Sequence, residues 1–281
     1  MSAVLENIGL PTCSQSDSNC IVKHMEEDGC IIMPNVLNKA QINEMKRQID
    51  ALVHLPHDGG YQETKACIDH YKCVFNRSPY WLQFIDMPGI IEAVDQMMGK
   101  ENHIIGMSAW RTPPGVGSNS MHVDQLLFPV DEELLTSKKV KIPIFYSTLH
   151  FYLNDMDVAL CPTWVVPGSH LSGRGPANIK SKNDSQGFVN GQEREWNGVK
   201  EVPVLVAAGD AMLFRSEVWH SGSVNKTKDR TRYLLQVHYA RRGIAQRFPP
   251  YTEFVYNKEV LAKASERQLR MLGKHQIGAY G

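Results

Sequence analysis

The feature that most constrains the fold of this chain is a change of hydrophobic period near residue 103. Before it, apolar residues recur at helical spacing. After it, short runs rich in β-branched and aromatic residues alternate with Pro and Gly clusters. These runs occupy residues 103–112, 142–153, 163–170, 202–220 and 231–240. Short strands punctuated by turns are typical of a sandwich or barrel, so the sequence predicts a mainly β core.

Helical patterns flank this core on both sides. They cover residues 17–27, 38–55, 88–100 and 257–273, and a short apolar strand is expected over residues 30–37. Asn38 is the expected N-cap of the second helix. We predict one domain of 281 residues, with 1–100 a mostly helical flank, 101–245 the β core and 246–281 a C-terminal helical segment.

Composition narrows the class of protein. Basic and acidic residues number 30 each, which argues against a nucleic-acid binder and gives no basic run for a membrane surface. No apolar run approaches the roughly 20 residues that span a bilayer. The first residues lack a secretory signal, so a cytoplasmic location is expected. Six scattered cysteines without CxxC spacing predict reduced, mostly buried thiols.

Two polar residues stand out in the stretch "SNSMHVDQLLFP", because His122 and Asp124 are two positions apart in a strand-like run. Alternation places both side chains on one face of a strand. An imidazole beside a carboxylate is either a neutral hydrogen-bonded pair or two ligands of a metal. The choice depends on a third ligand elsewhere in the chain.

Four later histidines in the β region are candidates for that ligand: His150, His170, His220 and His238. His170 follows a turn signal and is expected to stabilise the turn. His150 and His238 lie within strands, where a histidine with a hydrogen-bond partner is the ordinary case. His220 ends a strand and meets a turn, and sites are built at such barrel mouths. It is therefore the preferred third ligand.

Two histidines and one carboxylate form the facial ligand set of non-haem Fe(II) oxygenases. The set leaves three positions open for a chelating 2-oxo acid and O₂. An arginine after His220, either Arg230 or Arg232, could pair with the far carboxylate of that co-substrate. A hydrolytic zinc enzyme is one rival, but the chain has no HExxH helix and Arg232 would have no role. A non-catalytic β-barrel is the other rival.

The chain resembles the phytanoyl-CoA dioxygenase family of Fe(II)/2-oxoglutarate oxygenases in "MHVD", "WVVPGSH", "GDAMLF" and "WHSGSVNKTKDRTR". The likeness runs from "EEDGCIIMPNVL" to "LLQVHYA" and implies a double-stranded β-helix, a jelly roll of cupin type, with helical flanks. It implies that His122, Asp124 and His220 are iron ligands, and that Arg232 binds 2-oxoglutarate. Lys72 and His150 match, more weakly, family positions beside the co-substrate.

Departures from the family pattern concern the pocket lining rather than the ligands. Leu160-Cys161 stands where Asn-Gly is common, His150 where a tryptophan is common, and Gly222 where a serine often contacts the co-substrate. Related halogenases lack the carboxylate that Asp124 supplies, so the resemblance favours hydroxylation, desaturation or oxidative cleavage.

The expected partner is a small-molecule substrate of specialised metabolism, for instance a polar amino-acid-derived compound of the mycosporine type. An acyl-CoA thioester is the alternative, with Lys138, Lys139 and Lys141 as candidates for its phosphates, although a solvated loop is the more expected setting for these residues. A homodimer is left open.

Overall fold

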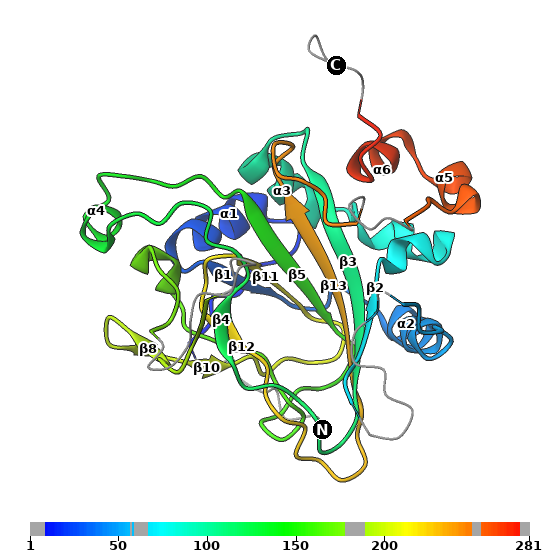
Figure 1. The fold of residues 1–281 in the computed structure, drawn as a ribbon, viewed down its shortest axis with the longest axis horizontal. Coiled ribbons are helices and arrows are strands. Elements are labelled where there is room, and N and C mark those ends of the chain that lie inside the picture. Colours follow the sequence, from blue (N-terminus) through cyan, green and yellow to red (C-terminus); the bar gives the residue numbers. More distant parts are fainter. Residues whose placement is uncertain (1–8, 57, 59–66, 178–188, 249–253, 276–281) are drawn as a thin grey trace.

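Two β-sheets face each other in the computed structural model, which describes residues 9–56, 58, 67–177, 189–248 and 254–275 (Figure 1). The larger sheet has six strands in the order β1-β11-β5-β13-β3-β2, and the smaller has five in the order β10-β6-β12-β4-β7. This double-stranded β-helix with flanking helices confirms the predicted fold class.

The larger sheet is built from β1 (Cys30–Met33), β2 (Asp69–Lys72), β3 (His103–Thr112), β5 (Tyr146–Tyr152), β11 (Ala211–Arg215) and β13 (Arg232–Ala240). The smaller sheet consists of β4 (Met121–Val123), β6 (Trp164–Val165), β7 (Val189–Gly191), β10 (Val202–Pro203) and β12 (His220–Ser221). A separate hairpin pairs β8 (Glu195–Trp196) with β9 (Val199–Lys200). The strands of the smaller sheet are thus only two or three residues long.

Alternation along β5 and β13 separates an outer and an inner face of the larger sheet. Leu149 and Phe151 of β5, with Leu235 and Val237 of β13, pack in the main hydrophobic core against the helices. The inner face carries the polar side chains of these strands toward the smaller sheet. Burial of the outer face fixes the register, because a slip of one residue would turn the polar set into the core.

The N-terminal flank supplies three helices and both edge strands of the larger sheet. The helices are α1 (Ser18–Glu27), α2 (Lys39–Asp50) and α3 (Ile90–Met98), with two 3-10 helices, η1 (Val74–Asn76) and η2 (Pro79–Phe84). Asn38 caps α2 as predicted, in a capping box with Gln41. The edge strand β2 was not expected, because "DHYK" carries no apolar alternation; it forms by pairing with β3.

The C-terminal segment differs from the single helix predicted over residues 257–273. It forms α5 (Lys258–Lys263) and α6 (Glu266–Met271), because Ala264 is extended and the Ser265 side chain caps the second helix. The structure adds α4 (Glu132–Thr136) in the connection between β4 and β5, and the 3-10 helix η3 (Ser169–Ser172) after β6.

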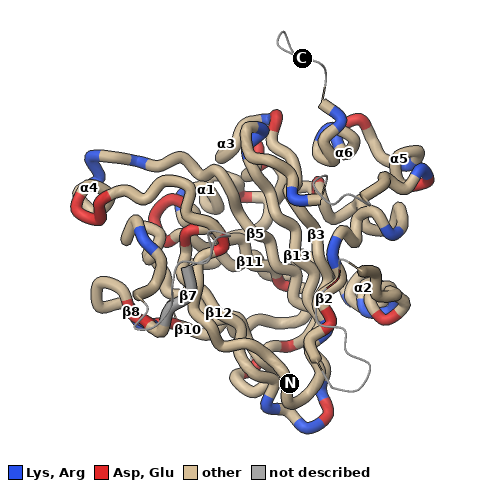
Figure 2. Tube along the Cα trace, in the orientation of Figure 1, with Lys and Arg blue, Asp and Glu red and all other residues tan. Residues whose placement is uncertain are grey.

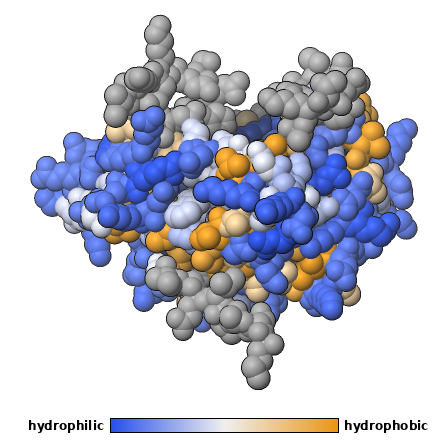
Figure 3. Space-filling view, turned by 90° about the horizontal axis from the view of Figure 1, so that it is seen from below, coloured by the Kyte–Doolittle hydropathy of each residue, from blue (hydrophilic) through white to orange (hydrophobic). Residues whose placement is uncertain are grey.

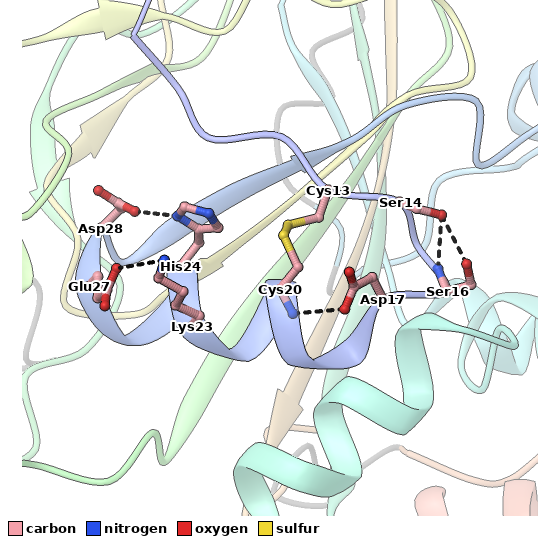
Figure 4. The surroundings of a disulfide bond; sticks show 9 residues. All are labelled: Cys13, Ser14, Ser16, Asp17, Cys20, Lys23, His24, Glu27 and Asp28. Atoms are coloured by element: carbon pink, nitrogen blue, oxygen red, sulfur yellow. Dashed lines mark hydrogen bonds and ion pairs between the residues drawn. A yellow bond between two sulfur atoms is a disulfide. The ribbon is translucent and has the colours of Figure 1, made fainter.

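The prediction of reduced cysteines is wrong for two of the six. Cys13, just before α1, forms a disulfide with Cys20 in its first turn, and their Cα atoms are 6.1 Å apart (Figure 4). Sequence spacing gave no sign of this bond, because the chain turn that brings the two residues together is set by the Asp17 cap of α1. Cys30, Cys73 and Cys161 are free thiols and are buried.

Charges of both signs lie mainly on helices and loops around the largely uncharged sheets (Figure 2). The face shown in Figure 3 is mostly hydrophilic, with smaller hydrophobic patches between the polar residues. Within the described residues, no helix has the length and apolar character needed to cross a bilayer.

Candidate active site

The smaller sheet brings His122 and His220 together. His122 lies on β4 and His220 begins β12, and the antiparallel register makes the two residues direct partners. Their ring centroids are 4.3 Å apart. Residues separated by almost a hundred positions in sequence thus share one face of one ladder, because cross-strand partners project to the same side.

Asp124 completes the cluster from the position just after β4, where its backbone N–H donates to Ser216 O at 2.9 Å. Its Oδ1 lies 3.6 Å from His220 Nε2 and 3.9 Å from His122 Nε2. One donor atom from each of the three residues lies within 4.8 Å of the others. The arrangement predicted from the sequence, two imidazoles and one carboxylate facing a common point, is therefore present.

Each of these three side chains is held in one orientation by a hydrogen bond to a residue outside the cluster. Nδ1 of His122 donates to Ser120 O at 2.8 Å, and Nδ1 of His220 donates to Val218 O at 2.9 Å. Both Nε2 lone pairs are consequently directed at the centre of the cluster, as in metal-bound histidines. The Thr148 hydroxyl donates to Asp124 Oδ2 at 2.9 Å and leaves Oδ1 for the centre.

The pKa values fit a cluster that binds a cation. Burial, together with repulsion from His220, lowers the pKa of His122 to about 4, so this imidazole is neutral at pH 7. Burial alone would raise the pKa of Asp124, but attraction to His220 outweighs it and keeps the carboxyl ionised. Burial opposes protonation of His220, yet Asp124 raises its pKa. A metal ion would take the place of that shared proton.

Arg232 begins β13 and points into the space between the sheets, where it is only 8% exposed. Its Nη2 donates to Thr163 Oγ1 at 3.2 Å, and its guanidinium lies 5.9 Å from the Tyr152 ring centroid. Its Nε has no hydrogen-bond partner among the described residues. A buried cation with an unused donor is costly unless an anion binds there. Arg230 instead pairs with Asp157 at 2.6 Å on the surface.

A cavity of about 400 Å³ contains the three-residue cluster and Arg232. His150, on β5, also lines it, and its Nε2 accepts a hydrogen bond from Gln236 at 2.8 Å. Lys72 does not line the cavity, although it shares a strand face with His70, which does. Contact of Lys72 or His150 with 2-oxoglutarate stays a prediction.

Sequence reasoning missed several polar residues of the cavity wall. Tyr146 and Thr148 share the inner face of β5 with His150, and the Tyr146 hydroxyl lies 2.9 Å from His238 Nδ1. Gln236, which strand alternation places on the same face as Arg232, accepts from Trp110 Nε1 at 2.6 Å. The run "YSTLHFY" gave little signal, because polar or aromatic residues occur on both faces of this strand and all seven residues are buried.

Gly222 occupies the position at which the family often has a serine that contacts the co-substrate. Gly222 lines the cavity, and so do its neighbours Ser221 and Ser223. The Ser223 hydroxyl donates to Pro162 O at 2.8 Å. The Ser221 hydroxyl is buried without a hydrogen-bond partner in the described part of the chain. Of the two serines, Ser221 is the one with a free hydroxyl for a bound molecule.

The residues present fit iron and 2-oxoglutarate. Two imidazoles, which bind metals in their neutral form, and one carboxylate are a donor set that suits Fe(II). The Arg232 Nε, which lacks a hydrogen-bond partner in the described residues, suits a carboxylate bound in the same cavity. A double-stranded β-helix with this donor set and this arginine defines the class of Fe(II)/2-oxoglutarate-dependent dioxygenases.

The chain belongs to the phytanoyl-CoA dioxygenase family, whose model matches residues 25–233. It is 22% identical over 229 residues to the dioxygenase aneA of Aspergillus aculeatus, covering 75% of this chain and 68% of aneA. It is 21% identical over 239 residues to the dioxygenase andF of Emericella variicolor, covering 82% of this chain and 73% of andF.

Solved structures show the same fold. The epimerase SnoN, crystallised with Fe³⁺, α-ketoglutarate and nogalamycin RO, superposes with a TM-score of 0.61 at 17% identity, over 85% of this chain and 91% of SnoN. HygX from Streptomyces hygroscopicus, with nickel and 2-oxoglutarate bound, gives a TM-score of 0.57 at 15% identity, over 80% of this chain and 88% of HygX. The enzyme is accordingly an Fe/2-oxoglutarate-dependent dioxygenase.

Proposed function

We propose that this dioxygenase oxidatively tailors a polar small molecule of specialised metabolism, by hydroxylation, desaturation or oxidative cleavage. The observation that carries the proposal is one cavity that contains His122, Asp124 and His220 together with the unsatisfied guanidinium of Arg232. This combination gives a role to every buried charge of the cavity. A hydrolytic zinc site would leave Arg232 without one.

In this proposal each residue has a defined task. His122, Asp124 and His220 hold the iron, and the backbone carbonyls of Ser120 and Val218 fix the two imidazoles. Arg232 binds the far carboxylate of 2-oxoglutarate through a charge-assisted hydrogen bond. The bound iron and co-substrate use O₂ to oxidise the substrate, with release of succinate and CO₂. The chain itself orients the reactants and shields them from water.

The dimensions of the cavity favour a compact substrate. A volume of about 400 Å³ lies toward the small end of ligand sites, and 2-oxoglutarate has to share it. The lining is rich in hydroxyl, imidazole and amide groups, which suits a polar compound. A mycosporine-type compound meets both conditions. Two structural relatives have natural products bound in their solved structures, nogalamycin RO in SnoN and hygromycin B in HygX.

A coenzyme A thioester has less support. Lys138, Lys139 and Lys141 do not line the cavity, and Lys141 pairs with Glu26 at 2.6 Å. The phosphates would have no cluster of free cations at these positions.

The test is a mass-spectrometric screen of the purified protein with Fe(II), 2-oxoglutarate and O₂. The panel contains mycosporine-type amino acids and acyl-CoA thioesters. We expect a panel compound to gain one oxygen, lose two hydrogens or lose a fragment, with one succinate formed per product. Product formation without succinate, or turnover under strict anaerobiosis, would contradict the proposed reaction.

A further inference from the structure

A second arginine reaches the same cavity from the end opposite Arg232. Arg247 lies in the segment after β13, and its backbone N–H donates to Ile105 O on β3. Arg232 pairs with Thr112 at the other end of β3. These two points are seven positions apart along β3, roughly 23 Å. The two arginines are therefore anchored at opposite ends of β3, and both line the cavity that contains the metal cluster.

The contacts of Arg247 place its guanidinium beside the metal cluster. Its Nη2 donates to Gln125 Oε1 at 3.4 Å, and Gln125 directly follows Asp124. Its guanidinium lies 5.1 Å from the ring centroid of Tyr146, which also lines the cavity. None of the described carboxylates forms an ion pair with it. The side chain is thus held in place by neutral groups and keeps donors available.

Arg247 is the one cation among the described lining residues for which neither the chain nor the cofactors supply a counter-ion. Asp124 is the one acidic residue among the lining residues, and Arg232 and Arg247 are both cationic. Fe(II) and the dianion of 2-oxoglutarate cancel each other. The other histidines add no charge at neutral pH, because burial lowers the pKa of His70 to about 3 and that of His238 to about 4. Arg247, which is exposed where it lines the cavity, is therefore the cation left to pair with solvent or with a bound anion.

We propose that Arg247 binds a carboxylate of the substrate, so that the primary substrate is a small organic acid. This inference rests on the proposed function and narrows its substrate class. Arg232 holds the carboxylate of the co-substrate at one end, and Arg247 holds that of the substrate at the other. A carboxylate fixed next to Gln125 places the rest of a compact molecule over the face of Asp124 and Tyr146. Arg247 is then a specificity-determining residue.

The experiment compares matched acids and esters as probes. Benzoylglycine, phenylacetate and cyclohexanecarboxylate are each titrated calorimetrically, as the free acid and as the methyl ester, into anaerobic enzyme loaded with Fe(II) and saturating 2-oxoglutarate. We expect the acids to bind about ten- to a hundredfold more tightly than their esters, the range for a charge-assisted hydrogen bond. Arg247→Gln should remove this difference, and Arg247→Lys should keep part of it.

The matched control is Arg242→Gln, which removes an exposed arginine that lies 3.5 Å from Glu101 and does not line the cavity. It should keep the preference for acids. Equal affinities for acid and ester in the unmodified enzyme, no binding of any acid, or a preference retained in Arg247→Gln would each overturn the inference. Succinate formation by the same enzyme is measured separately, after O₂ is admitted and with the substrate panel present. Its absence under those conditions would defeat the proposed function instead.

Discussion

Asp124 is the side chain on which most of the site converges. Its Oδ1 faces both histidines, its Oδ2 accepts from Thr148, and its backbone is fixed by Ser216. An ionised carboxylate this buried is stable only with such partners. Because it lies just beyond a strand end, its removal affects the cation site more than the packing of the core.

Replacing Asp124 by alanine should abolish iron binding and turnover while the fold is retained. The charge and one of the three ligands are lost together, and two imidazoles alone bind Fe(II) far more weakly. Metal analysis, succinate assay and thermal unfolding would be measured on the same preparation. The control is Asp157→Ala, which removes a surface carboxylate paired with Arg230. Full iron content in Asp124→Ala would contradict the ligand assignment.

Arg232→Ala should raise the apparent Michaelis constant for 2-oxoglutarate by about ten- to a hundredfold, because a charge-assisted hydrogen bond contributes roughly 1.5–3 kcal/mol. Iron content should change little. Arg230→Ala is the matched variant, since Arg230 lies two residues away and is engaged with Asp157. If the defect appears in Arg230→Ala and is absent from Arg232→Ala, the assignment to Arg232 is wrong.

The sequence predicted the charged members of the site better than its neutral ones. His122, Asp124, His220 and Arg232 carry chemistry that few other arrangements explain, so their order along a β-rich chain was informative. Tyr146, Thr148 and Gln236 could equally be ordinary strand residues. Their roles appear only when the register places β5 and β13 side by side, with Gln236 opposite His150.

At the scale of the elements, local patterns located the long helices and strands well. The 103–112 run forms β3 over the same residues, and Asn38 caps α2. The failures are elements whose sequence has no periodicity of its own. The strand β2 depends on its partner β3. The break between α5 and α6 depends on Ser265, because serine can cap a helix or lie within one.

The capping box of α2 provides a test at this scale. Asn38→Ala should lower the free energy of unfolding by about 0.5–2 kcal/mol, because the Gln41 N–H loses its side-chain acceptor. Asn38→Gly should cost only a few tenths of a kcal/mol, since glycine is also favoured at this position. Urea unfolding of the three proteins would measure both. Equal losses in the two variants would show that the side-chain bond is not what stabilises the helix start.

At the scale of the whole molecule, the helical flank and the β core are joined at buried polar contacts as well as through the hydrophobic core. His170 is one of these contacts. It follows the "PGS" turn after β6 and donates from Nε2 to Glu26 O at the end of α1, at 3.1 Å. The bond joins the segment after β6 to α1, and it does not test the turn-stabilising role expected of His170. Its ring also packs against the backbone at Gly29, where a Cβ would lie 2.5 Å from Nδ1.

His170 should make the stability of the molecule sensitive to acid. Burial lowers its pKa to about 3 in the folded state, against an ordinary value of 6.5. The unfolded chain therefore binds a proton first as pH falls. The contribution is complete above pH 6.5 and is lost toward pH 3, at about 1.4 kcal/mol per pH unit.

The variant His170→Gln tests this dependence, since it removes the titrating group. The free energy of unfolding in urea, measured between about pH 5 and pH 7, should fall less steeply with decreasing pH in the variant than in the unmodified protein. The two slopes should differ by at most about 1.4 kcal/mol per pH unit, the value for one proton. Glutamine keeps an N–H donor for the Glu26 carbonyl. Identical slopes for the two proteins would mean that folding does not lower the pKa of His170.

The two sheets that enclose the cavity are unequal partners. One has strands of up to ten residues, and the other has strands of two or three. Few ladder bonds hold the short-stranded wall, so local opening is easiest there. Iron held by His122 and His220 would act as a cross-link between β4 and β12, which the chain joins only through a long excursion. Iron binding and local opening of the smaller sheet would then be coupled. The protein without iron would open most easily at the sheet that carries its metal ligands.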